Sequence, residues 1–549
     1  MLKIQVAGFM GSPIPTNIKY IASPAIDIEK MEAEEVAGFD FKLPKSIIGN
    51  LYDSDDIELK IGHDIEPYTT SVFLTSTASL VSGDYYWIKN ELVQVTVVSS
   101  TEISITRGEK GTFPNRYIKN DDREEYYYLR KYPKSLIGQR VFLYEDNDLL
   151  TIGLIKEQPK FNGSVLEFSC DNAVSSLDIP FTIPQESEVV YNGEYDFLTV
   201  QPLSIALNFN YLYGEEIFNI YYDKEVPPIL DYLSFPEILS IMPNSEYQTT
   251  IKYSDMPNIL DFVNLYAKLN GSVFTWDYNL KKYTVIQISD ISSLDTVTNQ
   301  TLSKYVSIKS NYNSKPYSGI AQISIKLENN VKINLNSINI MQFAKDSVLE
   351  LDLTKYMDIR PIDVKNVLFF YSRLFSVIYS ELTIPTHYSK FKDFKEGCFY
   401  DITDLDKFFT FQNISTKAFC LKKDEDKITF LITRNIVKNP IAPAVYGKMD
   451  SANKFLAINF RDYLDCMCSD IEGAKIEYYD YKYFMQDDIV EFIDSGGVKT
   501  QCKITGVSGD LISLDTSFTA GTYGFLTYAK ATEVNTRQQI FFYLDNSEW

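Results

Sequence analysis

Carboxylates are the most numerous side chains that could take part in catalysis or binding in this 549-residue chain, since 74 Asp and Glu residues outnumber 52 Lys and Arg residues. Two carboxyl groups held across one cleft could cut a glycosidic bond. The acidic clusters stand where turns are expected, however, and Asp is favoured there because it hydrogen-bonds to nearby backbone. We therefore predict no catalytic carboxylate pair. The clusters are Asp53, Asp55 and Asp56; Glu145, Asp146 and Asp148; Asp424, Glu425 and Asp426; and Asp487 with Asp488.

Histidine and cysteine are the next candidates, as metal ligands or nucleophiles. The two histidines, His63 and His387, have no cysteine or second histidine at ligand spacing, which argues against a zinc site or a histidine-activated nucleophile. Six cysteines are too few for a disulfide scaffold of this size. We predict small buried thiols, no catalytic residue, and no cofactor or metal site. The cysteines are Cys170, Cys398, Cys420, Cys466, Cys468 and Cys502.

Nucleic-acid and sugar motifs are weak. Gly108 to Gly111 matches the GxxG loop that clamps single-stranded RNA, but that loop needs flanking helices and strands are predicted here, so we expect a turn. No Walker-type or dinucleotide-binding glycine motif is present. Tyr126 to Tyr128, and the pairs that begin at Tyr85 and Tyr478, could form a sugar platform or simply pack within strands.

The overall charge sets a limit on partners. A net charge of −22 and a pI near 4.7 argue against a protein that grips duplex DNA over a broad face. The sequence has no secretory signal and no apolar run near 20 residues, so we expect no membrane insertion and synthesis in a reducing cytoplasm.

Short alternating segments between frequent turns predict a mainly β (α+β), multidomain protein of roughly three to five domains. Residues 71–117 predict a compact β module, and residues 134–170 predict three strands at Arg140–Tyr144, Leu150–Lys156 and Ser164–Cys170. Helical spacing predicts one helix between Ile259 and Leu269, followed by a strand pair that turns at Asn279, and another helix over about 362–379.

Two pairs of segments share a pattern. Gly138 and Gly397 each precede a strand, which is followed in turn by a strand with a small residue (Gly153 or Ala418), a polar turn and a closing strand. We therefore predict that 134–170 and 395–434 form two similar barrels. The stretch from Asp487 to Phe518 echoes the module at 71–112.

Three segments resemble the baseplate hub or tail-tip hub proteins of long-tailed bacteriophages and related gene-transfer particles. GDYYWIKNELVQVTVVSSTEISITRGEKGTFPNRY looks like a module common in tail proteins, which ends in a T-R-G-x-x-G-T turn, here Thr106 to Thr112. LIGQRVFLYEDNDLLTIGLIKEQPKFNGSVLEFSC looks like the first barrel of such hubs. MPNILDFVNLYAKLNGSVFTWDYNLKKYTVI resembles their helix plus hairpin, with Trp276-Asp277 as its aromatic-acid pair.

The resemblance implies two small tube-type β-barrels plus an α+β domain and small β modules. Its domains would be a first hub barrel at 1–190 with the module inserted at about 71–117, an α+β domain at 191–300, a second hub barrel with a long helix at 301–445, and a C-terminal β module at 446–549. The segment 191–250 matches nothing in the family.

The same resemblance implies a structural virion protein, assembled in the host cytoplasm, that closes or extends the tail tube and forms a conduit for DNA ejection. Its partners would be two further copies in a homotrimer, the tail tube or distal tail protein, the tape-measure protein, tail fibre or tip proteins, and DNA only in transit. Two alternatives stay open: another tail component, such as a distal tail ring or fibre-attachment protein, or a carbohydrate-binding or carbohydrate-active β protein.

Overall fold

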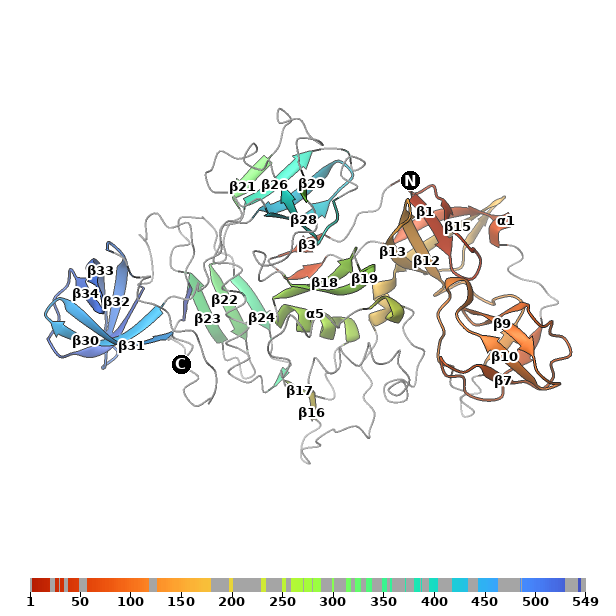
Figure 1. Ribbon diagram of the computed structural model, residues 1–549, viewed down its shortest axis with the longest axis horizontal. Coiled ribbons are helices and arrows are strands. Elements are labelled where there is room, and N and C mark those ends of the chain that lie inside the picture. The colour runs from red at the N-terminus through yellow and green to blue at the C-terminus, as the bar shows by residue number, and fades with distance from the viewer. Residues whose placement is uncertain are drawn as a thin grey trace.

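The computed structural model shows a multidomain, mainly β protein, as the strand pattern predicts (Figure 1). Its sheets follow one another along the molecule, with one barrel near each end and a hairpin covered by a helix between them (Figure 1). The structure describes residues 2–19, 25–28, 30–33, 38–48, 57–117, 126–178, 197–200, 229–233, 249–252, 258–269, 271–278, 280–287, 299–300, 313–316, 321–326, 332–337, 348–352, 356–357, 371, 380–385, 387, 394–402, 417–432, 443–462, 484, 486–528 and 542–544.

The first sheet has seven described strands, in the order β14-β15-β13-β12-β1-β2, with β5 also paired to β15. Its inner face buries alternate apolar residues, including Phe41, Val141 and Phe168. The three strands predicted within 134–170 are confirmed as β12, β13 and β15. The strands are β1 (Leu2–Val6), β2 (Ile14–Pro15), β5 (Phe39–Pro44), β12 (Arg140–Glu145), β13 (Asp148–Ile155), β14 (Lys160–Asn162) and β15 (Val165–Asn172).

The second sheet has six described strands, in the order β20-β27-β28-β29-β26-β21. Its core contains Leu382, Ile384, Phe394, Tyr400 and Phe430, all buried. The strands are β20 (Asn299–Gln300), β21 (Asn313–Pro316), β26 (Ser380–Pro385), β27 (Phe399–Ile402), β28 (Lys417–Lys423) and β29 (Lys427–Ile432).

A small barrel, which we call the inserted barrel, stands between β5 and β12 in the sequence and has the order β6-β11-β8-β9-β10-β7. An isolated bridge between Ile61 and Leu74, the residues that directly follow β6 and β7, closes the sheet at its two edges. Strands on both sides of residues 71–117, β6 and β11, complete this sheet. The strands are β6 (Glu58–Lys60), β7 (Ser71–Phe73), β8 (Tyr85–Ile88), β9 (Glu91–Val97), β10 (Glu102–Thr106) and β11 (Tyr128–Arg130).

The C-terminal barrel is closed, in the order β30-β31-β34-β33-β32-β35. Buried Phe455, Phe484 and Phe492 fill its interior. The strands are β30 (Pro443–Ser451), β31 (Lys454–Asp462), β32 (Ile489–Asp494), β33 (Lys499–Ser508), β34 (Leu511–Leu514) and β35 (Tyr523–Tyr528).

The predicted helix and strand pair near residue 270 are confirmed. Helix α5 (Ile259–Leu269) ends before Gly271, whose φ of 60° suits glycine, and leads into the antiparallel hairpin β18 (Ser272–Asp277) and β19 (Lys282–Gln287). The helix predicted over 362–379 lies outside the described residues except for Tyr371, which is helical and buried.

Shorter elements complete the described chain. The last strand, β36 (Phe542–Leu544), pairs with β23 and so joins a sheet that begins more than 200 residues earlier. The others are β3 (Ile26–Asp27), β4 (Glu32–Ala33), β16 (Phe197–Val200), β17 (Thr249–Lys252), β22 (Gln322–Lys326), β23 (Lys332–Ser337), β24 (Val348–Asp352), β25 (Tyr356–Met357), α1 (Lys45–Ile48), and the 3-10 turns η1 (Glu109–Gly111), η2 (Ala173–Leu177) and η3 (Leu230–Tyr232).

One backbone device recurs in the described part of all four large sheets and barrels. A residue with positive φ begins a G1-type bulge: its amide donates to the carbonyl of a residue on the neighbouring strand, and the amide of that residue donates to the carbonyl of the residue that follows the positive-φ residue, at 2.7 to 3.0 Å. We call it the opening bulge, because a strand starts two residues after it each time. The sets are Gly83, Asp84 and Val95; Gly138, Gln139 and Ile155; Gly397, Cys398 and Cys420; and Asp487, Asp488 and Ile504.

The opening bulge is part of a larger common plan. In each case the strand after the bulge pairs with the next strand, that one with a third, and the third with a strand that precedes the bulge in sequence, always antiparallel. The four sets are β8-β9-β10-β7, β12-β13-β15-β5, β27-β28-β29-β26 and β32-β33-β34-β31. Gly153 and Ala418, matched in the sequence, occupy equivalent registers opposite Val141 and Tyr400.

Candidate functional site

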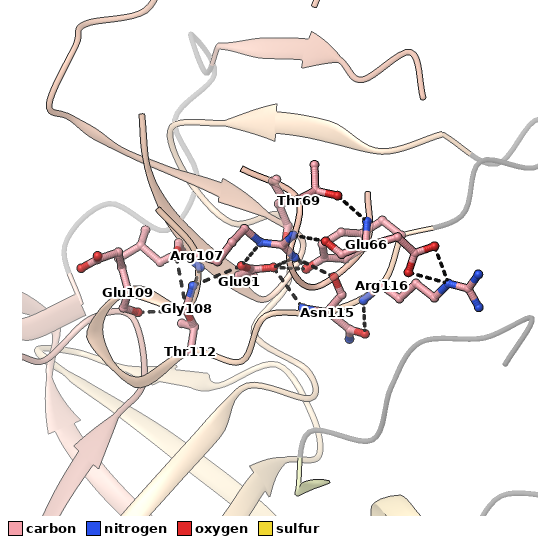
Figure 2. A network of polar contacts seen from close by, with 12 residues as sticks. Glu66, Thr69, Glu91, Arg107, Gly108, Glu109, Thr112, Asn115 and Arg116 are labelled. Carbon is pink, nitrogen blue, oxygen red and sulfur yellow. Dashed lines mark hydrogen bonds and ion pairs between the residues drawn. The ribbon is translucent and has the colours of Figure 1, made fainter. Parts of the chain in front are cut away.

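Polar side chains form a connected network around the T-R-G-x-x-G-T turn, from Thr106 to Thr112 (Figure 2). This turn follows β10 and includes η1, so the GxxG stretch is a turn beside strands, as predicted. Gly108, Lys110 and Gly111 all have positive φ, at 67°, 49° and 80°, which explains why two of the three positions are glycine.

Arg107 holds this turn from its buried side. Its Nε and Nη2 donate to the two carboxylate oxygens of Glu91 at 2.5 and 2.7 Å. Its Nη1 and Nη2 also donate to the backbone carbonyls of Glu66 and Asn115, both at 2.6 Å. The guanidinium thus ties strand β9 to two loops that are distant in sequence (Figure 2).

Glu91 is fully engaged by these neighbours. Besides Arg107, it accepts from the amides of Gly108 and Asn115 and from the Tyr117 hydroxyl, each at 3.2 Å. The Arg107 and Glu91 side chains are 7% and 0% exposed. Burial lowers the pKa of Arg107, but its hydrogen bond to Glu91 and the nearby negative charge outweigh this and raise the pKa overall. A carboxylate with this many donors has no open position for proton abstraction, so the network positions backbone.

The same turn fixes the inserted barrel to the first sheet. The Gly8 amide donates to the Lys110 carbonyl at 2.9 Å, and a Cβ on Gly8 would lie 2.2 Å from the Trp87 ring. The rings of Trp87 and Phe9 also pack, with centroids 5.0 Å apart. Because only glycine leaves room for this approach, Gly8 is required for the contact.

Arg140, the first residue of β12, lies on the other side of the turn. Its Nη2 donates to the Gly111 carbonyl at 2.6 Å, and its Nη1 donates to both carboxylate oxygens of Asp231 at 2.7 and 2.8 Å. The rings of Phe113, Phe142 and Tyr232 surround the guanidinium at 5.3 to 5.6 Å from their centroids. Burial raises the pKa of Asp231, and Arg140 opposes that rise.

The sequence does not predict this arrangement around Arg140. Arg140 and Asp231 are 91 positions apart, and Asp231 lies in the segment 191–250 that matched no pattern. The one available signal is a cation directly before the apolar run from Val141 to Leu143.

The acidic clusters are found in turns where the structure describes them. Asp146 has a φ of 55° in the β12–β13 turn, and Asp487 has a φ of 76° in the opening bulge of the C-terminal barrel. Asp148 pairs with Lys281 at 3.6 Å, and Asp424 pairs with Lys427 at 3.6 Å. The cluster at 53–56 lies outside the described residues.

Cysteine and histidine do not form a reactive group in the described residues. Cys170, Cys398, Cys420 and Cys502 are buried free thiols, and burial raises the pKa of both Cys398 and Cys502 to about 12. Such thiols stay protonated and are poor nucleophiles near neutral pH. His63 packs edge-on against Phe73 at 5.6 Å. Cys466 and Cys468 lie outside the described chain.

Among the described residues, no group of three or more His, Cys, Asp or Glu side chains is placed to hold a metal ion. Helices within the described ranges are too short or too polar to cross a bilayer.

The tyrosine clusters pack against cations where they are described. Lys60 lies 3.1 Å from the centroid of Tyr126, Lys89 lies 4.8 Å from Tyr127, and Arg130 lies 5.1 Å from Tyr128. These rings therefore already have stacking partners within the inserted barrel. Tyr478 lies outside the described residues.

Comparison with known proteins gives matches among solved structures alone: no model of a protein family matches the sequence, and no curated protein does. A tail protein from Neisseria meningitidis is 11% identical, with 55% of this chain and 85% of that one covered and a TM-score of 0.33. The 43 kDa tail protein of prophage MuSo2 from Shewanella oneidensis is 10% identical, with 80% and 96% covered and a TM-score of 0.34. A prophage tail protein from Listeria monocytogenes is 10% identical, with 69% and 95% covered and a TM-score of 0.29.

Proposed function

We propose that this chain is a structural protein of a bacteriophage tail, and more narrowly the hub of a baseplate or tail tip. In this role it closes or extends the tail tube and surrounds the path of the DNA during ejection. The observation that carries the proposal is that the first and second sheets share the four-strand plan with its opening bulge and also have a small residue at one register, Gly153 and Ala418. Two such sheets in a single chain are what three copies need to present six similar units to a sixfold tube.

The inserted barrel supports the same proposal. The T-R-G-x-x-G-T turn that resembles a tail-protein module is the segment that seats this barrel on the first sheet, through Lys110, Gly111 and their neighbours. In the described residues the Glu91 carboxylate at this turn is surrounded by hydrogen-bond donors, and the thiols are buried. These properties fit a structural role for the inserted barrel.

The net charge suits a passage for DNA. Three copies at −22 would carry −66, and affinity for DNA regardless of sequence requires cationic side chains that release counterions. We propose that an acidic wall lets DNA pass without being held. Candidate residues for the rim are turn carboxylates such as Asp146, Asp148, Asp424 and Asp426.

The size and symmetry of the assembly test this role. Native mass spectrometry of the purified chain, and electron microscopy of particles that contain it, should reveal a threefold ring at the end of the tail tube. In that ring, the first and second sheets should be related by roughly sixty degrees about the axis. A stable monomer at micromolar concentration, with no ring in particles, would contradict the proposal.

DNA binding provides an independent test. A mobility-shift titration at low salt should show no binding to duplex DNA, and the channel wall should carry more Asp and Glu than Lys and Arg. Tight, salt-sensitive binding would contradict the conduit while leaving the symmetry test unaffected.

A further inference from the structure

We propose that Arg140 couples two interfaces of the first sheet, so that a change that weakens the packing of the inserted barrel also weakens the packing of residues 229–233, and the reverse. We call the group Gly111, Phe113, Arg140, Phe142, Asp231 and Tyr232 the Arg140 junction. The inference concerns this chain's own mechanics and holds whether or not the chain is a tail hub.

The first observation is that one guanidinium serves both interfaces. Arg140 donates to the Gly111 carbonyl in the inserted barrel and to both oxygens of Asp231 in η3, all within 2.8 Å. A planar guanidinium presents its donors in fixed directions, so the grip on Asp231 also sets the direction of the donor that reaches Gly111. The Arg140 side chain is 5% exposed, which limits replacement of either partner by water.

The second observation is that aromatic rings join the same three elements. Phe113 comes from the inserted barrel, Phe142 from β12 and Tyr232 from η3, and all three face the guanidinium. Phe142 contacts Tyr232 at 5.9 Å between centroids, and a Cβ on Gly111 would lie 3.3 Å from Phe142. A shift of either neighbour would therefore move Phe142 and disturb the other.

The third observation is that η3 extends the connection into the hairpin. Tyr232 stacks on Trp276 at 6.5 Å, and Leu233 bridges to Tyr283. The equivalent position to Arg140 holds Tyr85, Phe399 and Ile489 in the other three units, so among the four units only the first sheet has a cation at this position.

Hydrogen exchange of the full chain tests the coupling. In Asp231→Asn, exchange should accelerate in the peptide with residues 229–233 and also in the peptides with Gly8 and 107–114, which Asp231 does not touch. In Phe113→Leu, the effect should spread in the other direction: exchange should accelerate in the peptide with 107–114 and also in the peptide with 229–233. The cross effect should lie in the range typical of coupled sites, about 5- to 150-fold.

Two comparisons keep the test decisive. Glu167→Gln removes the partner of an exposed ion pair on the same sheet, with Lys42 at 2.6 Å, and should change neither region. The double variant Asp231→Asn with Phe113→Leu should accelerate exchange by less than the product of the single effects. Acceleration confined to the region that contains each substitution, or strict multiplication in the double variant, would overturn the inference.

Discussion

The first and second sheets share a four-strand order and an opening bulge, but the side chains near the bulge differ in chemistry. In the first, Arg140 begins β12 and binds two neighbouring elements through charge and hydrogen bonds. In the second, Phe394 packs on Tyr400 at 4.8 Å and on Phe430 at 5.3 Å, which makes an aromatic core. The difference teaches that the bulge sets the backbone plan, while the side chains near the bulge determine which neighbouring elements pack there.

The largest expected effect concerns the buried ion pair of the barrel that is inserted before β12 of the first sheet. Glu91→Gln removes the charge that neutralises buried Arg107, and loss of one partner of a buried pair typically costs about 3–5 kcal/mol. Exchange-resolved urea unfolding should show this loss in peptides from 91–117. Lys42→Met, at an exposed pair, should cost about 1 kcal/mol or less. Equal losses of stability in the two variants would show that the buried Arg107–Glu91 ion pair contributes no more than an exposed pair.

A pH titration tests the hairpin that lies between the sheets. Burial raises the pKa of Tyr283 to about 12, and its hydroxyl donates to Asn172 at 3.0 Å. The folded state therefore holds this proton more tightly than the unfolded state, so stability is full below the ordinary value of 10.0 and declines as pH rises toward about 12. At about 1.4 kcal/mol per pKa unit, the loss approaches about 3 kcal/mol.

Tyr283→Phe should lack this part of the alkaline decline. The measurement is the free energy of unfolding from pH 9 to 12, in the wild type and the variant, with tyrosinate absorbance recorded in parallel. Parallel pH curves for the two proteins would show that Tyr283 ionises without affecting the fold.

The equivalent residues Gly153 and Ala418 should respond in ways set by their neighbours. A Cβ on Gly153 would lie 2.8 Å from the Phe39 ring and 3.0 Å from Cys170, so Gly153→Ala should destabilise the first sheet by about 1–3 kcal/mol. Ala418→Gly should cost about 1 kcal/mol in the second sheet, through backbone entropy and a lost methyl group. Thermal unfolding of both variants checks this, and a stabilising Gly153→Ala would contradict the packing.

The smallest effect compares opening bulges. Gly138→Ala and Gly397→Ala place a Cβ at φ of 81° and 75° and should each cost about 1–2 kcal/mol. Asp487→Gly, at a φ of 76°, should instead leave stability unchanged or raise it by up to about 1 kcal/mol. If the units share one bulge, alanine should lower stability at this position, whereas glycine should not. The same sign for all three substitutions would break the comparison.

Much of the fold follows from local patterns. Gly138, Gly397 and the small residues after them indicate two related sheets because the bulge needs a positive φ and the register needs a small side chain. The plan common to all four units is harder to predict from the sequence. Asp487 stands where the other units have glycine, and the inserted barrel separates β5 from β12 of the first sheet.

The polar networks could be predicted only in part. The T-R-G-x-x-G-T spacing marks a turn, but it does not tell that Arg107 reaches back to Glu91 and to the carbonyl of Glu66. The contact of Arg140 with Asp231 depends on how whole sheets dock, which no local period encodes. The domain boundaries and the trimer stay predictions.

The pairing of β36 with β23 has a consequence for the C-terminal barrel. Residues 542–544 return to the sheet formed by β22, β23 and β24, so the chain both enters and leaves the barrel toward the body of the protein. A domain that is joined to the rest of the chain at both of its ends has less rotational freedom than a domain joined at one end. A truncation before residue 542 would therefore remove one of the two connections between the barrel and the body, and would also remove a strand from a sheet that is distant in sequence.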